Sequence, residues 1–177
     1  MSRNVVQVNR APVLTLWAAV VAERLGYDHA AALSFGKVLA GLNAQAKGRT
    51  LGIYKPAERP EGAPLKKARP GEEFRVELLG RAIPAKATAE GVRAVVDGAP
   101  VRPEGVERYL ESKFGSALPA VEKTMRSLAD SFKPAELEAV AYSLYERFRP
   151  EIPAGVRGWG AKGDLDLDRI LSLKRRG

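Results

Sequence analysis

The segment GWGAKG, residues 158–163, has the glycine spacing G-x-G-x-x-G of loops that bind the pyrophosphate of a dinucleotide. Such a loop requires a strand before it and the amino terminus of a helix after it. Here Pro150 and Pro153 precede the segment, and the residues before them have the pattern of a helix. The phosphate-loop motif also fails, because Ala161 stands where that motif needs its lysine. We therefore predict a structural connection instead of a nucleotide site.

Two interpretations of this connection stay open. In the first, the glycines allow unusual backbone angles and Trp159 packs into a helical core. In the second, Arg157, Trp159 and Lys162 form a secondary contact patch, because aromatic and cationic side chains together bind single-stranded nucleic acid.

Three aspartates in the segment DLDLDR, residues 164–169, suggest a cation site. A calcium loop needs glycine at its sixth position and an acidic residue at its twelfth, and these positions hold Arg169 and Arg175. The segment therefore does not match a calcium loop. We expect instead that Asp164 or Asp166 caps a short final helix.

The other residue types that do chemistry are scarce. The chain of 177 residues has no cysteine, and its only histidine is His29. His29 follows Asp28 at the start of a predicted helix, so we expect a solvated or capping side chain. The sequence accordingly predicts no metal site, no cofactor and no catalytic activity.

Basic side chains are in excess, with a formal net charge of +8, and the excess is greatest toward the amino terminus. Such a field favours a polyanionic partner. The predicted nucleic-acid contacts are amide and basic side chains at the end of one helix and on a neighbouring β ribbon, types that bond base edges and phosphates. They are Asn43, Gln45, Lys47, Arg49, Lys55, Arg75 and Arg81.

These residues predict a nucleic-acid-binding protein, with DNA favoured over RNA. The alternative is a protein-interaction or scaffold module without catalytic activity, because basic residues at a helix carboxy terminus also offset the helix dipole. No apolar run approaches the roughly 20 residues of a membrane span, so we expect a cytoplasmic protein without a membrane partner.

Two amino-terminal helices form the predicted core of the fold. The segment APVLTLWAAVVAERLGYD is apolar on nearly every face, which is typical of a buried helix, with Gly26 as its stop. Asp28 then caps a second helix that runs to Gly48. Small residues recur in it every four positions, including Ala32 and Gly36, and predict close packing against the first helix. The pair forms a helical hairpin, with a helix-turn-helix as the alternative.

The remaining chain predicts a small ribbon and further helices. TLGIY and FRVELLGRAI, residues 50–54 and 74–83, are interpreted as two antiparallel strands joined by a mobile proline-rich loop, residues 58–71. TAEGVRAVVDG, residues 88–98, is a short helix or a strand, and we favour a helix capped by Thr88 and ended by Gly98. The segments from residues 102, 118 and 133 onward have helical periodicity. The predicted fold is a single α+β domain over residues 1–177, mainly helical, as a bundle with a small antiparallel ribbon.

Four segments together resemble a conserved bacterial protein family of unassigned function. They are LTLWAAVVAERLGYDHAAAL, AGLNAQAKGRTLGIY, VERYLESKFG and FRPEIPAGVRGWGAKGDLDLDRI. The resemblance covers nearly the whole chain outside the proline-rich loop. It implies no activity, cofactor, partner or site residue.

Overall fold

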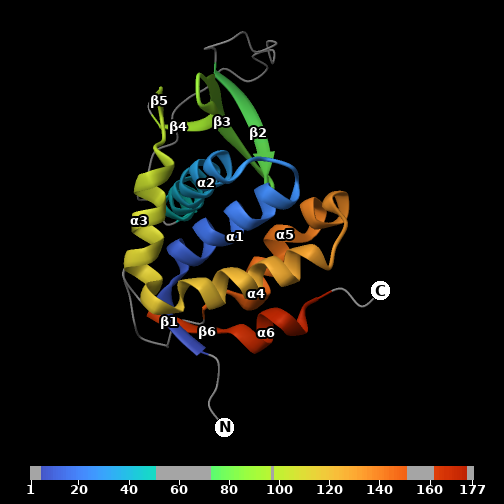
Figure 1. Cartoon of the computed structure of the whole chain (residues 1–177). Helices are drawn as coiled ribbons and strands as arrows, with labels where there is room; N and C mark the ends of the chain where they lie inside the picture. Colours follow the sequence, from blue (N-terminus) through green and yellow to red (C-terminus); the bar gives the residue numbers. More distant parts are fainter. Residues whose placement is uncertain (1–4, 51–72, 97, 151–161, 175–177) are drawn as a thin grey trace.

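The computed structural model in Figure 1 describes residues 5–50, 73–96, 98–150 and 162–174, with the side chains of 43–50, 73 and 162 excepted. It is a mainly helical α+β fold with small antiparallel sheets, as predicted. The helices are α1 (Arg10–Arg24), α2 (His29–Thr50), α3 (Pro103–Phe114), α4 (Leu118–Asp130), α5 (Pro134–Phe148) and α6 (Leu167–Ser172). The strands are β1 (Val5–Asn9), β2 (Glu73–Leu78), β3 (Arg81–Thr88), β4 (Gly91–Val96), β5 (Ala99–Pro100) and β6 (Lys162–Asp166).

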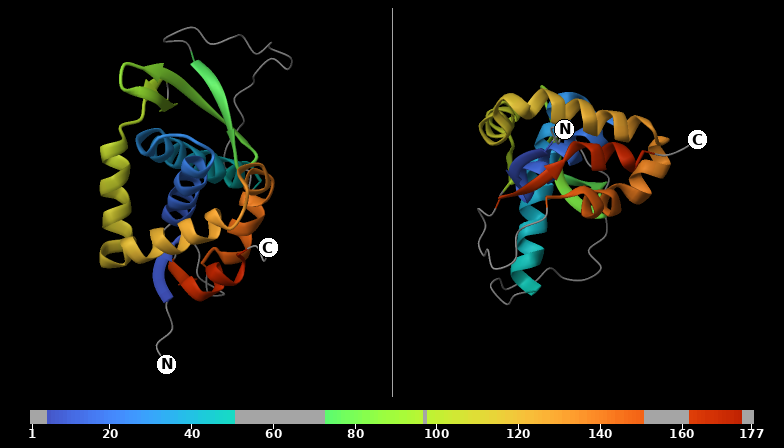
Figure 2. Two further views of the ribbon diagram at one scale, coloured as in Figure 1. Left: turned by 45° about the vertical axis from the view of Figure 1, so that its right-hand side comes forward. Right: turned by 90° about the horizontal axis from the view of Figure 1, so that it is seen from below.

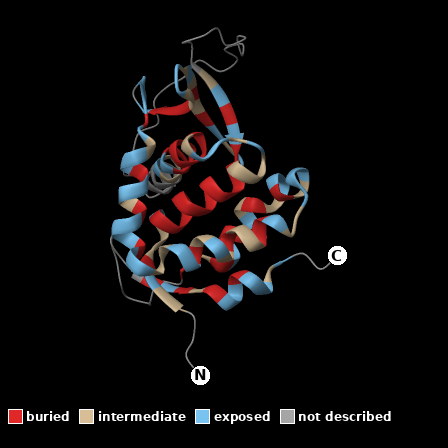
Figure 3. Cartoon of the chain, viewed as in Figure 1, coloured by how far each residue is buried: buried red, intermediate tan, exposed pale blue. Residues whose placement is uncertain are grey.

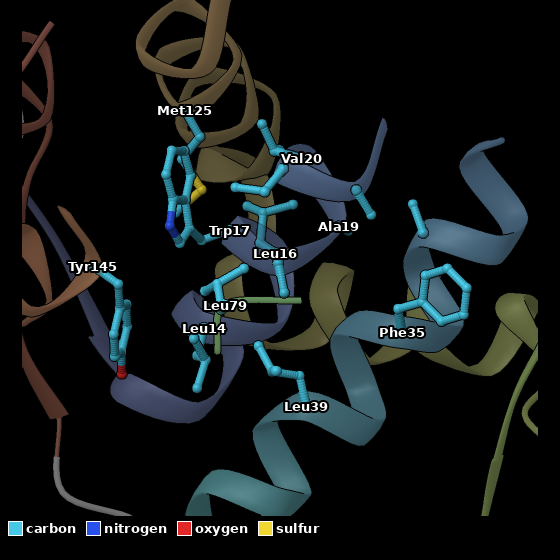
Figure 4. Close-up of a cluster of buried hydrophobic side chains, with 14 of the residues drawn as sticks. Leu14, Leu16, Trp17, Ala19, Val20, Phe35, Leu39, Leu79, Met125 and Tyr145 are labelled. Atoms are coloured by element: carbon cyan, nitrogen blue, oxygen red, sulfur yellow. The ribbon is translucent and has the colours of Figure 1, made fainter. Parts of the chain in front are cut away.

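Helix α1 is the centre of the molecule, surrounded by α2, α3, α4 and α5 (Figures 2 and 3). Every residue from Pro12 to Ala22 is buried, which confirms the prediction of a helix apolar on nearly every face. The Trp17 side chain is fully buried; its Nε1 donates to the carbonyl of Ala141 at 2.9 Å, and its ring meets the Phe148 ring edge-on. This satisfied indole anchors α1 to α5 within the apolar cluster drawn in Figure 4.

Helices α1 and α2 approach closely because α2 carries a glycine at the crossing. A Cβ built on Gly36 would lie 2.3 Å from the backbone oxygen of Thr15. Gly26 ends the first helix with a φ of 111°, and the Asp28 Oδ1 accepts from the Ala31 amide at 2.7 Å. The predicted small-residue contact, glycine stop and aspartate cap are therefore confirmed. The second helix continues to Thr50, two residues beyond the predicted end at Gly48.

The four-stranded sheet has the order β2-β3-β4-β5 and packs on α2. Its inward side chains, among them Val76, Ile83 and Ala94, join the same core as α1. The segment 74–83 is not one strand, because Leu79 and Gly80 form a turn with φ of 49° and 75°. The observed partner of β2 is β3. Of the expected partner, residues 50–54, Thr50 ends α2 instead of starting a strand, and residues 51–54 and the proline-rich loop 58–71 lie outside the described residues.

The prediction of a helix over residues 88–98 was wrong. Thr88 ends β3, and its hydroxyl donates to the carbonyl of Gly91 at 2.7 Å instead of capping a helix. Gly91 turns the chain with a φ of 120°, and β4 then pairs with β3 through Ala94 opposite Ala85. The apolar residues fit either a short helix or a strand, and pairing with the preceding strand β3 together with packing on α2 decides between them.

Strands β1 and β6 form a two-stranded antiparallel sheet that sequence reasoning missed, with Val5 opposite Asp166 and Asn9 opposite Lys162. Asp166 caps α6, because its side chain accepts from the amides of Asp168 and Arg169. The capping prediction is thus confirmed for Asp166. The other predicted candidate, Asp164, instead accepts from Gln7 Nε2 across the sheet. In the described part of the chain, no helix has the length and apolar character needed to cross a membrane.

Candidate functional site

The predicted nucleic-acid contacts occupy three separate places in the chain. Residues 43–49 belong to the last two turns of α2, where the structure describes the backbone alone, and Lys55 lies outside the described residues. Arg75 is exposed on β2 and Arg81 is half-buried at the start of β3. Of the predicted set, only Arg75 and Arg81 therefore have side chains that can be placed.

Arg75 and Arg81 lie on opposite faces of the sheet. Arg81 is paired with Leu78, whose side chain enters the core, whereas Arg75 shares the outer face of β2 with the exposed Glu77. Arg81 lines a small hollow together with Glu138 and Tyr142 of α5. The turn at Leu79 and Gly80 thus sets these two predicted contacts on different faces of the sheet.

A basic region that sequence reasoning did not single out lies where α5 ends. It comprises Arg10, Arg147, Arg149 and Arg169, and we call it the arginine surface. Arg10 Nε donates to the carbonyl of Pro150 at 2.8 Å, and Arg169 Nε donates to the carbonyl of Arg147 at 2.6 Å. The last carbonyls of a helix lack intrahelical partners, so they are suited to accept from guanidinium groups. The starts of α1 and α6 thereby meet the end of α5.

Three of the four guanidinium groups of this surface have no carboxylate partner among the described residues. They are the groups of Arg147, Arg149 and Arg169. The Arg149 guanidinium lies 6.0 Å from the centre of the Tyr145 ring. Burial raises the pKa of Tyr145 to about 12, although the charges of Arg149 and Arg10 act to lower it. The phenol therefore stays neutral and does not offset the positive charge.

The secondary patch predicted from sequence is connected to the arginine surface at both flanks. Arg157 and Trp159 lie outside the described residues, and Lys162 is described only by its backbone. Before this segment, the carbonyl of Pro150 accepts a hydrogen bond from Arg10 Nε. After it, Lys162 pairs in the β1–β6 sheet with Asn9, the residue next to Arg10. The chain therefore leaves and re-enters the described structure beside Arg10.

A second feature is a pocket of about 200 Å³ between α1, α2, α3 and α4, here called the His29 pocket. Its floor is apolar, formed by Leu16, Ala19, Val20, Leu33, Leu110 and Leu118. Its rim is acidic, formed by Glu23, Glu107, Glu111 and Glu122 together with His29. An apolar floor with few polar groups at its edge is the usual composition of a ligand pocket.

His29 bridges two carboxylates from different helices. Its Nδ1 lies 3.4 Å from Glu23 Oε2, and its Nε2 lies 3.2 Å from Glu107 Oε1. Asp28, not His29, caps the helix. The interpretation of His29 as solvated or capping therefore missed its bridging contacts, although the side chain is half exposed. No sequence signal indicates them, since His29 and Glu107 are 78 residues apart.

Arg126 of α4 does not line the pocket but bonds two carboxylates of its rim. Its Nη2 lies 2.7 Å from both Glu23 Oε2 and Glu122 Oε1. Burial acts to lower the pKa of Arg126, but the hydrogen bonds to Glu122 and Glu23 outweigh it and leave the pKa above its ordinary value. One guanidinium and one imidazole thus face four carboxylates, so the rim is negative overall.

The polar groups that line the His29 pocket are carboxylates and one imidazole. Its lining, as far as the structure describes it, includes no hydroxyl or thiol nucleophile beside the imidazole. Among the described residues no three histidine, aspartate or glutamate side chains are arranged to hold a metal ion.

The fold and these two features define a helical α+β protein with separate acidic and basic surfaces. Comparison of the chain with protein-family models, with curated proteins and with solved structures gave no match. The resemblance to a bacterial family therefore stays a prediction.

Proposed function

We propose that the protein binds nucleic acid, DNA in preference to RNA, through the arginine surface and the segment that leaves it. The observation that supports this function best is the gathering of Arg147, Arg149 and Arg169 without carboxylate partners among the described residues. In a protein of net charge +8, such side chains are available to a polyanion.

Arginine suits this role by geometry as well as by charge. A guanidinium carries five N–H donors in a fixed plane, and it binds phosphate oxygens in pairs. The bond from Arg169 Nε to the carbonyl of Arg147 uses one donor and fixes the side chain's direction. The remaining donors are left for phosphate.

The segment after Pro150 extends the proposal from phosphates to bases. It contains Arg157 and Trp159, and its flanks are held at Arg10 by the contacts described above. A tryptophan beside arginines binds single strands by stacking on bases while the cations hold the backbone. The end of α2, with Lys47 and Arg49, stays a second predicted contact.

The test is the salt dependence of binding to duplex DNA, single-stranded DNA and RNA. Log affinity falls with log salt by about 0.9 per phosphate contact on a duplex and about 0.7 on a single strand. Three arginine contacts, by Arg147, Arg149 and Arg169, therefore predict a slope of about −2.7 on duplex DNA. The double variant Arg147→Ala/Arg169→Ala should flatten the slope by about 1.8 on a duplex, or about 1.4 on a single strand.

The matched control is Arg102→Ala/Arg108→Ala. Both residues are exposed, the change in charge is the same, and Arg108 belongs to α3, which Figure 1 shows apart from α6. The control should keep the wild-type slope. Lys47→Ala/Arg49→Ala, measured alongside, tests the end of α2. No binding at low salt to any of the three nucleic acids, or equal losses in both arginine variants, would refute the proposal.

A further inference from the structure

The His29 pocket offers a binding site that nucleic-acid binding does not use. Its apolar floor belongs to side chains that are almost fully buried, such as Leu16, Val20 and Leu33. Its mouth is ringed by glutamates, so a phosphate would be repelled there. The occupant must combine an apolar body with a positive end.

Two carboxylates are placed to receive that positive end. Glu107 and Glu111 are four residues apart on α3, so they project from the same face of the helix, and both line the pocket. Glu111 makes no side-chain hydrogen bond or ion pair with a described residue, and Glu107 contacts only His29. In contrast, Glu23 and Glu122 are already bonded to Arg126.

The lining also distinguishes among cations. No Phe, Tyr or Trp ring lines the pocket in the part the structure describes, so a quaternary ammonium would lack the ring faces that bind it best. A metal ion would lack a suitable set of ligands among the described residues. A primary ammonium has three N–H donors in a compact group and can bond two carboxylates while its carbon chain stays on the leucines.

We infer that the His29 pocket binds a primary aliphatic ammonium, with Glu107 and Glu111 holding the nitrogen and the leucine-lined floor holding the carbon chain. Two sources share this chemistry, a free alkylamine and the lysine side chain of a partner protein. The lysine case would agree with the protein-interaction function that the sequence left open.

Calorimetric titration of the full chain with n-hexylamine tests the inference, with n-hexanol and hexanoate as matched probes at constant ionic strength. Hexylamine should bind saturably at one site. Hexanol should bind more weakly because it lacks the charge, and hexanoate should show no saturable binding because the rim repels it. Equal binding of hexanoate and hexylamine, or no saturable binding of hexylamine, would overturn the inference.

Variants on α3 locate the site. Glu111→Gln should weaken hexylamine binding about tenfold or more, because a charged hydrogen-bond partner is lost. Glu104→Gln is the control, since Glu104 is exposed on the same helix and does not line the pocket, and it should leave the affinity unchanged. Equal effects of the two substitutions would place the binding elsewhere.

The two sources separate with a capped lysine, Nα-acetyl-lysine amide. Binding at least as tight as that of hexylamine assigns the pocket to a protein side chain, and binding of hexylamine alone assigns it to a small amine. Both results support the chemistry of the site. Neither depends on nucleic-acid binding, so the two proposals fail independently.

Discussion

At the scale of single residues, the polar groups in the interior are few and nearly all bonded. The Trp17 indole donates to the carbonyl of Ala141. The Ser34 hydroxyl donates to the carbonyl of Ala31 and accepts from the amide of Ala94. Ser34 thus connects α2 to β4 through one hydroxyl. A buried group that both donates and accepts avoids the cost of an unpaired polar atom.

Tyr145 provides a pH-dependent prediction. Its pKa is about 12 in the folded protein and about 10 when unfolded, so the neutral phenol stabilises the fold below pH 10. That contribution is lost as the pH rises from about 10 through 12. For a shift of about two units, the total loss of stability is about 2.7 kcal/mol. The free energy of unfolding of the wild type should therefore fall more steeply over this range than that of Tyr145→Phe.

The comparison with Tyr145→Phe removes the effects of lysines that titrate in the same range. At pH 8 the two proteins should have nearly equal stability, because the Tyr145 hydroxyl donates only a long bond of 3.4 Å to the Arg10 carbonyl. Parallel curves from pH 9 to pH 12 would show that the phenol is more hydrated than its burial indicates.

At the scale of elements, the crossing of α1 and α2 determines how the core is built. Gly36→Ala should destabilise the protein by about 1–3 kcal/mol or more, since the added methyl group would meet the rigid backbone of Thr15 at 2.3 Å. Gly41→Ala on the same helix is the control, because nothing lies within 4 Å of its Cβ position. It should stabilise the protein by about 0.5–1 kcal/mol through helix propensity.

Denaturant unfolding of both variants checks this prediction. If Gly41→Ala destabilised the protein as much as Gly36→Ala, helix propensity would not determine the change in stability at the exposed position. An unchanged midpoint for Gly36→Ala would mean that the helices can separate at no cost.

The elements also show what sequence can predict. Gly26, Asp28 and the small residues of α2 act on neighbours close in the chain or on an adjacent helix, and these were predicted. The strand β4 depends on its packing against the distant helix α2, and the strands β1 and β6 pair from opposite ends of the chain, which the local pattern does not specify. The local pattern was also insufficient for the candidate sites. The position of one turn places Arg75 and Arg81 on different faces, and His29 contacts Glu107 only when α2 and α3 pack together.

At the scale of the whole molecule, charge is separated along α1. Arg10 at its start belongs to the arginine surface and Glu23 at its end to the His29 pocket. At 1.5 Å per residue these positions are about 20 Å apart, well beyond the screening length of about 8 Å at physiological salt. Each surface can therefore attract its own ligand with little influence from the other.

Hydrogen exchange should follow the same arrangement. Amides of α1, enclosed by four helices, should exchange only through global unfolding, whereas those of β1 and β6 should exchange through local opening at a lower free energy. Exchange measured residue by residue by NMR checks this ranking. Equal protection of β1 and α1 would show that the two-stranded sheet opens only with the core.

The antiparallel pairing of β1 and β6 also has a mechanical consequence. Val5 lies opposite Asp166, so a force that draws the start of β1 away from the end of β6 loads their bonds one after another, as in a zipper. Bonds loaded in sequence resist less than bonds sheared together. Under tension from a translocating motor or an unfoldase that grips near Val5, β1 would peel away first, and the pull would then pass directly to Arg10 and the core helix behind it.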